Sequence, residues 1–498
     1  MVTVSLPSWP WDVVRQIAAE RGIQVWPVGG VVRDILMGRA RHDWDFTVDR
    51  DALELARAVA DTLEGAFYPL DPERDTGRVV LRSGGRRIEM DFARLRGPTL
   101  EADLRGRDFT VNAMAVGPDG RLVDPTGGLA DLQARRLRAV GPEAFDQDPL
   151  RMLRAVRLVA ELSLRLDAQT AQWIIGRAET IARASAERVR DELARLLAAP
   201  AVAYHLQLAD ELGLMAQIIP ETAPLKEQRQ THPHRFNVWW HTLMAVEAAE
   251  NILRRLTGDP PLADYTDAPT QAWDDVRSLL QPFALMLTAH FRRRLAANRT
   301  RRVLFLLTVF CHDLGKPLTV TEDEQGRLHF YGHEAIGARM TAERMRALRF
   351  SRAETERAAT AIRAHLRPAQ LADAPGGVTG RAAYRFFRAT GDAGVDVVLL
   401  ALADHLSIWG PDLQPDRWAR RLDAARALLE HFLVRGKGAA ALPPLVSGSD
   451  LMRELGLREG PQVGKLLEAI REAQAEGEVT TPEEALALAR RLLRKGDG

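Results

Sequence analysis

The sequence predicts an N-terminal region with α/β or α+β patterning, followed by an almost wholly helical chain. Two observations predict this division. In roughly the first 140 residues, short apolar runs of strand length alternate with helical segments. From Asp148 onward, apolar residues recur at spacings of three and four, which is typical of amphipathic helices.

The N-terminal region contains four predicted strands and one predicted helix. The strands are Ile23–Val28, Asp45–Val48, Arg78–Leu81 and Arg87–Phe92, and the helix is Val31–Met37. The clearest helices after them are Asp148–Glu161, Ala186–Ala198, Trp239–Leu256 and Ala353–His365. The last helix is predicted to start with a capping box formed by Thr481, Pro482 and Glu484.

Length and composition limit the classes of protein that fit. A chain of 498 residues predicts three or four domains. The net charge of +1 does not by itself indicate a nucleic-acid binder. The single cysteine, Cys311, excludes an intramolecular disulfide and fits the cytoplasm. The apolar runs are too short for a membrane span, so no membrane contact is expected.

A strand, two glycines and a helix start meet at Gly29 and Gly30. Glycines let a phosphate approach the backbone closely, and the N–H groups of a helix start favour an anion. Arg33, in the first turn of the helix, would add a positive charge beside the same phosphate. Alone, such a turn is usually structural.

Two pairs of acidic residues alternate with apolar ones. In an extended strand Asp43 and Asp45 face the same side, and so do Glu89 and Asp91. Carboxylates that point together require cations between them. Two Mg²⁺ ions about 4 Å apart activate an attacking hydroxyl and neutralise a leaving pyrophosphate. The alternative interpretation is a solvated turn and a solvated strand face.

These elements resemble the class II tRNA nucleotidyltransferase and bacterial poly(A) polymerase family, which carries Gly-Gly-x-Val-Arg-Asp followed by Asp-x-Asp. The resemblance implies that Glu89, rather than Asp91, is the third catalytic carboxylate beside Asp43 and Asp45, with Mg²⁺ as the metal. A further segment resembles the ribose-recognition element of the family. Its nucleotide-binding residues would be Arg107, Asp108 and Asn112.

The segment from Asp148 to Arg157 resembles the element with which the family reads the incoming base. Asp148 would accept a hydrogen bond from the exocyclic amine of cytosine or adenine, and Arg151 would donate to the ring nitrogen. Arg154 and Arg157 would face the triphosphate of CTP or ATP, although arginines at this spacing are more often a solvated face. The family usually has Glu where this chain has Gln147.

One departure from the family leaves two hypotheses open. Enzymes of the family that build the whole CCA end carry a flexible loop between the third-carboxylate strand and the ribose element. Here Arg94 runs almost directly into Glu101. A missing loop goes with enzymes that add CC and leave the terminal A to a separate A-adding enzyme on the same tRNA. The chain therefore transfers either CMP and AMP, or CMP alone.

Six further residues follow the order His, His-Asp, His, His, Asp: His241, His312, Asp313, His333, His365 and Asp404. A His-Asp pair in an apolar helix is costly to bury without a metal or another partner. The order resembles the HD phosphohydrolase superfamily, which implies a centre with a divalent transition metal or Mg²⁺ that hydrolyses phosphate esters. His232, His234 and His405 do not fit the order and are expected at the surface or behind the ligands.

Together the resemblances imply a domain order and a set of partners. The resemblances imply the α+β class, with a nucleotidyltransferase-fold head that contains a short mixed β-sheet (1–145), followed by all-α domains. These are a helical neck with the base-recognition helix (146–218), an HD domain (219–434) with an insertion at about 257–300, and a helical tRNA-binding tail (435–498). The partners are tRNA, CTP and ATP, and the sequence indicates no oligomeric state. The alternatives are a poly(A) polymerase, and a chain that is mainly an HD phosphohydrolase or phosphodiesterase.

Overall fold

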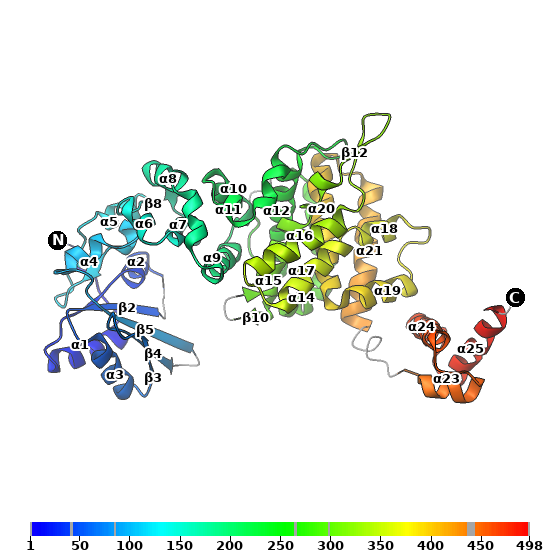
Figure 1. Cartoon of the computed structure of the whole chain (residues 1–498), viewed down its shortest axis with the longest axis horizontal. Helices are drawn as coiled ribbons and strands as arrows, with labels where there is room; N and C mark the ends of the chain where they lie inside the picture. The colour runs from blue at the N-terminus through cyan, green and yellow to red at the C-terminus, as the bar shows by residue number, and fades with distance from the viewer. Residues whose placement is uncertain are drawn as a thin grey trace. The chain divides into compact units, whose positions relative to one another are not determined.

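A computed structural model of the protein describes residues 2–39, 43–83, 86–262, 266–296, 299–435 and 444–496. The chain forms two compact units (Figure 1). The first consists of Met1–Arg188 and Leu208–Gln217, and the second of Val189–Gln207 and Ile218–Gly498. Residues of the predicted neck fall in both units.

The first unit is built on a five-stranded sheet with the order β1-β2-β5-β4-β3. Its strands are β1 (Val25–Pro27), β2 (Asp43–Val48), β3 (Ala66–Asp71), β4 (Thr76–Ser83) and β5 (Arg86–Arg94). β2 and β5 run parallel and the other pairs are antiparallel, so the sheet is mixed, as predicted. β3 was not predicted, because most of its side chains are exposed and its sequence lacks an apolar alternation.

One face of the sheet is apolar and is covered by α1 (Ser8–Glu20) and α3 (Ala52–Thr62). Phe46 stacks on Phe92 with ring centroids 4.9 Å apart, and Trp11 of α1 stacks on Phe46 at 6.2 Å. α3 packs on β4 and β5. Because successive side chains of a strand point to opposite faces, this burial turns the alternate residues of β2 and β5 to the other face.

The other elements of the first unit are short, apart from one long helix that carries the predicted base-reading residues. They are α2 (Gly30–Leu36), α4 (Leu100–Arg105), η1 (Thr110–Asn112), β6 (Ala115–Val116), β7 (Leu122–Val123), α5 (Gly128–Gln133), β8 (Arg136–Leu137), α6 (Glu143–Gln147), α7 (Leu150–Leu162), β9 (Arg165–Leu166), α8 (Ala168–Ile175) and η2 (Ala178–Arg183). Three helices have residues in both units: α9 (Ala186–Ala198), α10 (Val202–Glu211) and α11 (Met215–Ile218).

The second unit is helical. Its α-helices before residue 430 are α12 (Val238–Thr257), α13 (Thr270–Leu280), α14 (Ala284–Arg292), α15 (Arg301–Cys311), α16 (His333–Ala347), α17 (Arg352–Ala364), α18 (Arg367–Asp373), α19 (Gly380–Thr390), α20 (Gly394–Trp409) and α21 (Pro415–Leu429). Its short elements are η3 (Pro220–Lys226), η4 (Gln281–Phe283), β10 (Arg294–Ala296), β11 (Arg299–Thr300), η5 (Lys316–Leu318), β12 (Thr321–Glu322), β13 (Leu328–His329), η6 (Gly391–Ala393), η7 (Gly410–Asp412) and the π-helix η8 (Glu430–Arg435).

α12 lies at the centre of this unit and packs against α15 and α20, while α17 packs against α15, α16 and α20. The predicted insertion at about 257–300 contains α13 and α14, both of which pack on α12. Residues 263–265 and 297–298 of that insertion, and 436–443 at the start of the predicted tail, lie outside the described residues.

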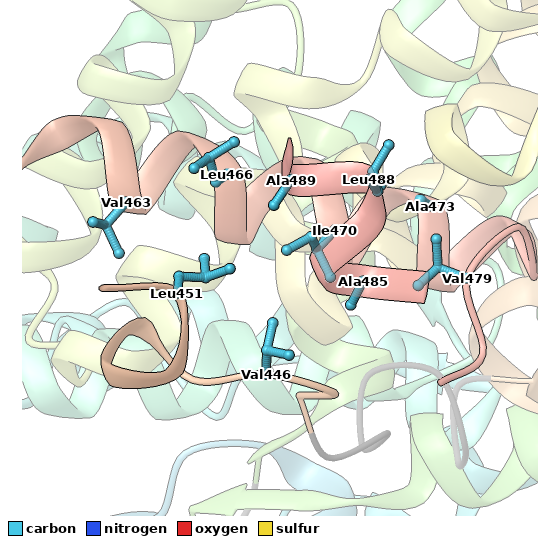
Figure 2. Close-up of a cluster of buried hydrophobic side chains, with 10 residues drawn as sticks. All are labelled: Val446, Leu451, Val463, Leu466, Ile470, Ala473, Val479, Ala485, Leu488 and Ala489. Carbon is cyan, nitrogen blue, oxygen red and sulfur yellow. The ribbon is translucent and has the colours of Figure 1, made fainter. Parts of the chain in front are cut away.

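The C-terminal segment has a small apolar core of its own (Figure 2). It consists of α23 (Gly448–Leu455), α24 (Pro461–Glu476) and α25 (Pro482–Gly496). Leu451 and Ala485 are fully buried in this core. The predicted capping box is present, since the Glu484 amide donates to Thr481 Oγ1 at 3.2 Å and the Thr481 amide donates to Glu484 Oε2 at 3.2 Å.

One helical stretch among the described residues, Gly380–Asp412, is long and apolar enough to cross a membrane by length and composition. Of its most apolar window, 83% is buried inside the protein. The stretch contains α20, whose side chains pack on α12 and α17.

Candidate functional sites

A row of carboxylates lies on the sheet face opposite α1 and α3. The parallel pairing of β2 with β5 places Asp43 beside Glu89 and Asp45 beside Asp91. Asp43 and Asp45 are exposed, and Glu89 and Asp91 are half-buried. The structure therefore brings the three predicted catalytic carboxylates onto one face of two neighbouring strands, where hard oxygen ligands suit Mg²⁺.

Arg78 lies among these carboxylates, and the sequence interpretation did not single it out. It faces Asp91 across the β4–β5 pair and donates to both oxygens of that carboxylate at 2.7 and 2.8 Å. Its guanidinium is also 2.8 Å from Glu89 Oε2, and Arg87 is 2.8 Å from Glu89 Oε1. The hydrogen bond to Asp91 and the surrounding charges raise the pKa of Arg78 further above its ordinary value.

Gly29 stands where the carboxylate row meets the predicted ribose element. Its φ is +72°, and a Cβ added there would lie 2.9 Å from Arg107 Nη1 and 3.8 Å from Asp45 Oδ2, so the position excludes a side chain. Its amide donates to the Met114 carbonyl at 3.0 Å. Gly30 begins α2 immediately after it.

Arg33 is buried and does not reach the surface at which we expected it to meet a phosphate. Its Nε donates to Asp34 Oδ1 at 2.8 Å and its Nη1 to Asn112 Oδ1 at 2.5 Å. Asn112 in turn donates to Asp108 Oδ1 at 3.0 Å. Arg33 thus ties α2 to η1, and it positions Asn112 and Asp108.

Asp108 is held as an anion by its neighbours. Burial alone would raise the pKa of its carboxyl, but the charge of Arg154, the Asn112 amide and the charge of Arg151 lower it below its ordinary value. Arg154 Nη1 lies 3.3 Å from Asp108 Oδ2. Arg107 donates to Asp103 Oδ2 and to Thr47 Oγ1 on β2, so it contacts the strand that carries Asp43 and Asp45.

A cavity of about 720 Å³ in the first unit collects five of the ten predicted nucleotide-binding residues. Its charged lining, within the described chain, is seven arginines and three aspartates: Arg74, Arg96, Arg107, Arg151, Arg154, Arg183, Arg188, Asp103, Asp108 and Asp148. The excess of positive charge suits a triphosphate. Sequence reasoning missed Arg74, Arg96, Arg183 and Arg188, which approach from four separate segments.

The α7 arginines differ in where they point. Arg151 and Arg154 line this cavity, but Arg157 is not part of the lining and pairs with Glu161 at 2.5 Å one turn further along the helix. Arg151 is buried and donates to the Ala144 carbonyl at 3.1 Å and to Gln147 Oε1 at 3.2 Å. The predicted contact of Arg157 with a triphosphate therefore has no support in this geometry.

The six predicted HD residues come together in the second unit. His241 lies on α12, His312 and Asp313 follow α15, His333 begins α16, His365 follows α17, and Asp404 lies on α20. The Nε2 atom of His241 lies 3.2 Å from Asp313 Oδ2 and 3.1 Å from Asp404 Oδ1. His333 Nε2 lies 3.3 Å from Asp313 Oδ1 and 3.4 Å from His365 Nε2.

The second ring nitrogen of each histidine is fixed by a separate acceptor. The Nδ1 atoms of His312, His333 and His365 donate to the carbonyls of residues 309, 330 and 362 at 2.7, 2.6 and 2.7 Å. Because a carbonyl only accepts, these rings carry a proton on Nδ1 and turn Nε2 inward. This is the arrangement that orients histidine ligands around metals.

The inward atoms fit a pair of cations. The ligand atoms of His241, His312 and Asp313 lie within 4.8 Å of one another, and so do those of Asp313, His333 and His365. The two sets share Asp313. His241 Nε2, His312 Nε2 and both Asp313 oxygens are buried and lack a hydrogen-bond partner in the part of the chain that the structure describes. Burial on this scale is costly unless a cation meets these atoms.

Lys316 completes the cluster and was not predicted. Its Nζ lies 2.7 Å from Asp313 Oδ2 and donates to Gln230 Oε1 at 2.7 Å. Burial would raise the pKa of Asp313, but His312 and Lys316 lower it well below its usual range. The spacing of three residues between Asp313 and Lys316 was the available sequence signal.

Gly315 allows this region to fold so tightly. A Cβ at Gly315 would lie 2.2 Å from the His333 carbonyl oxygen and 2.7 Å from the Gly337 amide nitrogen. The turn that follows α15 therefore touches the backbone of α16 directly.

The remaining histidines have separate surroundings. His234 lines a cavity of about 380 Å³ with His333 and Lys316, and its ring lies 5.3 Å from that of His241. Burial lowers the pKa of His234 to about 3, so its ring is neutral. His405 stacks on Trp418 and His232 packs edge-on against Trp409.

Four family models match the chain. They are a poly A polymerase head domain at residues 25–138, a probable RNA- and SrmB-binding site of polymerase A at 163–226, an HD domain at 283–409, and a tRNA nucleotidyltransferase domain 2 at 441–489. His241 precedes the HD match, yet the fold brings it to the cluster.

Two curated relatives cover nearly the whole chain. One is an A-adding tRNA nucleotidyltransferase of Deinococcus radiodurans, 36% identical over 95% of this chain and 96% of the relative. The other is a CC-adding tRNA nucleotidyltransferase of Thermus thermophilus, 36% identical over 93% of this chain and 92% of the relative.

Solved structures share the fold at lower identity. A CCA-adding enzyme in complex with ATP matches with a TM-score of 0.64 and 20% identity, over 98% of this chain and 96% of that one. A Thermotoga maritima CCA-adding enzyme complexed with tRNA matches with a TM-score of 0.61 and 20% identity, over 98% and 96%.

Proposed function

The chain belongs to the tRNA nucleotidyltransferase family, and we propose that it transfers CMP from CTP to the 3′ end of tRNA. The observation that carries this proposal is the exposed row of Asp43, Asp45 and Glu89, held in register by the β2–β5 pairing. The arginine-lined cavity of the same unit supplies the counter-charge for a triphosphate.

In this proposal the carboxylates bind the metal and the cavity residues bind the nucleotide. Asp43, Asp45 and Glu89 would hold Mg²⁺, which when bound activates the attacking hydroxyl and neutralises the leaving pyrophosphate. Arg107 contacts Thr47 two residues after Asp45 and also lines the cavity, so it lies where a ribose joins the base to the phosphates. Arg154 would orient the triphosphate, and Arg33 positions Asn112 from behind.

Asp148 and Arg151, which both line the cavity, would select the incoming base. A carboxylate accepts from the amine of cytosine or adenine, and a guanidinium donates to the neighbouring ring nitrogen. Uracil and guanine present a carbonyl and an N–H at those positions, so each group would face a group of its own kind. Such unpaired polar groups are strongly disfavoured in a closed pocket.

We propose further that the enzyme stops after two cytidines. β5 ends at Arg94 and α4 begins at Leu100, so the segment between them is only residues 95–99. This segment is pinned by the Arg96 amide, which donates to Asp103 Oδ1 at 3.1 Å. A connection this short cannot form the flexible loop that accompanies addition of the terminal A.

The test is extension of tRNA transcripts that end before, within and after CC. With CTP alone we expect the CCA-less transcript to grow by two residues and stop, and with ATP alone no transcript should grow. One added A on the CC-ending transcript would show A addition, as in the Deinococcus relative. Long A-tracts on any transcript would make the chain a poly(A) polymerase and refute the proposal.

A second activity is favoured by a separate observation, the inward Nε2 atoms around Asp313. We propose that this cluster holds a resident pair of divalent cations, which supply a metal-activated water for phosphate-ester hydrolysis. His234 and Lys316 line the adjoining cavity of about 380 Å³, where a phosphate would sit. The test is hydrolysis of a 2′,3′-cyclic phosphate and a 3′-phosphomonoester on RNA. Activity that survives Asp313→Asn would count against this site.

The tail and the domain boundaries complete the proposal. Residues 435–498, whose helices α23, α24 and α25 form a core of their own, would grip tRNA by its shape and backbone. The head, neck and HD boundaries at 145, 218 and 434 remain the ones that we infer from the sequence.

A further inference from the structure

Arg188 on α9 contacts Asp148, the carboxylate that we propose selects the incoming base. Its Nη2 donates to Asp148 Oδ2 at 2.7 Å, while Asp148 Oδ1 accepts from the Leu150 amide at 3.2 Å. Each oxygen of Asp148 therefore has its own donor. Asp148 and Arg188 both line the cavity of about 720 Å³.

The arginines of α7 are engaged with other groups. Arg151 donates to the Ala144 carbonyl and to Gln147, and Arg154 lies against Asp108. Asp148 follows α6 in an extended conformation, with φ −149° and ψ 98°, and its side chain is held by the Leu150 amide at Oδ1 and by Arg188 at Oδ2. The contact from α9 is what orients Oδ2.

We propose that Arg188 is a specificity-determining residue that acts by positioning Asp148. A carboxylate oxygen has two lone-pair directions, so Oδ2 accepts from Arg188 and from a base amine at the same time. Held in this way, Asp148 turns a fixed acceptor toward the base. Cytosine supplies the matching donor, and uracil brings a carbonyl against it. The inference rests on the proposed CMP transfer.

Removal of Arg188 takes away the contact that orients Oδ2. The Leu150 amide then holds only Oδ1, so the carboxylate can turn about that contact and no longer presents a fixed acceptor to the base. Loss of Arg188 therefore weakens discrimination between cytosine and uracil, more than it weakens binding in general.

The experiment compares CTP and UTP as single substrates on CCA-less tRNA, with the full-length chain. For Arg188→Ala we expect kcat/KM for CTP to fall about fivefold, mainly through KM, because the pair is half-exposed and its strength modest. The ratio of kcat/KM for CTP to that for UTP should fall by about the same factor. Arg188→Lys keeps the charge without the planar fork, so its CTP:UTP ratio should lie between those of Arg188→Ala and the wild type.

Arg195→Ala is the matched control, since Arg195 is an exposed arginine on the same helix and does not line the cavity. It should leave the CTP:UTP ratio unchanged. The ratio is independent of how much protein is folded, because both substrates meet the same preparation. In an Asp148→Ala background, Arg188→Ala should change the ratio no further.

Two outcomes overturn the inference. One is an equal loss for CTP and UTP in Arg188→Ala, which would make Arg188 a structural residue. The other is an additive effect in the Asp148→Ala background, which would mean that Arg188 acts independently of Asp148. Both leave CMP transfer by the wild type intact. A wild type that adds no CMP to CCA-less tRNA would instead remove the proposed function, and this inference with it.

Discussion

The carboxylate row of the sheet and the HD cluster are both candidate cation sites, and they differ in burial and in partners. Asp43 and Asp45 are exposed to water, and Arg78 and Arg87 already balance Glu89. Around Asp313 the ligand atoms are buried, two histidine Nε2 atoms lack a hydrogen-bond partner within the described chain, and the carboxylate is paired with Lys316 at 2.7 Å. Water and arginine stabilise the first set without a metal, whereas one lysine faces the several buried ligand atoms of the second set, so we propose that the second set holds a metal.

The difference in burial predicts different residence times for a cation bound at the carboxylate row and one bound at the HD cluster. A site that is already satisfied gains little from a resident ion, so Mg²⁺ can arrive and leave with the nucleotide. Cations bound among buried ligand atoms would contribute to the stability of the fold, so we expect them to stay bound at the HD cluster. The two sites should therefore respond to opposite kinds of perturbation, one in catalysis and the other in stability.

The largest expected effect is on catalysis at the sheet. Asp45→Asn keeps the shape of the side chain but removes a charge that Mg²⁺ needs, so CMP transfer to CCA-less tRNA should fall about a thousandfold. The thermal unfolding temperature should hardly change, because Asp45 is exposed. Asp313→Asn is the control and should transfer CMP at the wild-type rate. A small loss in Asp45→Asn would contradict the role of the row.

The next effect is on stability at the HD cluster. A cation bound at about a hundred times its dissociation constant stabilises a fold by ~2.7 kcal/mol. At 2–4 °C per kcal/mol, removal with EDTA should lower the unfolding temperature by about 5–10 °C. Differential scanning calorimetry measures the shift. Asp313→Asn should abolish the response to EDTA and Asp45→Asn should retain it. The reverse pattern would show that the stabilising cation binds at the carboxylate row and not at the HD cluster.

A smaller effect tests whether Arg78 stands in for a metal charge. Arg78 pairs with Asp91 and lies 2.8 Å from Glu89, so it competes with Mg²⁺ for the row. Arg78→Gln should lower the Mg²⁺ concentration for half-maximal CMP transfer about threefold, because the row becomes more negative. Arg87→Gln removes a more exposed contact to the same Glu89 and should change it less. A higher Mg²⁺ requirement in Arg78→Gln would show that Arg78 orders the row rather than competing for it.

Local patterns were sufficient to predict the parts of the molecule that neighbouring residues decide. The helix Ala186–Ala198 has the predicted bounds, and the capping box of Thr481 forms as its sequence implies. The alternation in β2 and β5 correctly placed the acidic residues on one face. The six HD residues were predicted from the resemblance of their order to the HD superfamily, and each lies on a helix or directly at its end.

Partners far apart in the sequence could not be read in this way. Arg33 is buried and donates a hydrogen bond to Asn112, which lies 79 residues further along the chain. Arg78 meets Asp91 only through the register of β4 with β5, and Arg188 reaches Asp148 from a helix 40 residues away. Arg157 was expected at the triphosphate, but Glu161, one turn along the same helix, holds it instead. These side chains take their roles from tertiary pairing, which a spacing rule does not contain.

The smallest effect concerns Gln147, the residue at which this chain departs from its family. Gln147 Oε1 accepts from Arg151 at 3.2 Å, and burial lowers the pKa of that guanidinium. Gln147→Glu would replace a neutral hydrogen bond by a charge-assisted one, so Arg151 should be held more firmly for the base. We expect KM for CTP to fall about twofold with kcat unchanged, measured on CCA-less tRNA. Gln169→Glu makes the same charge change on exposed α8 and should have no effect. If KM for CTP rose instead, the result would show that Arg151 must move away from residue 147 to reach the base.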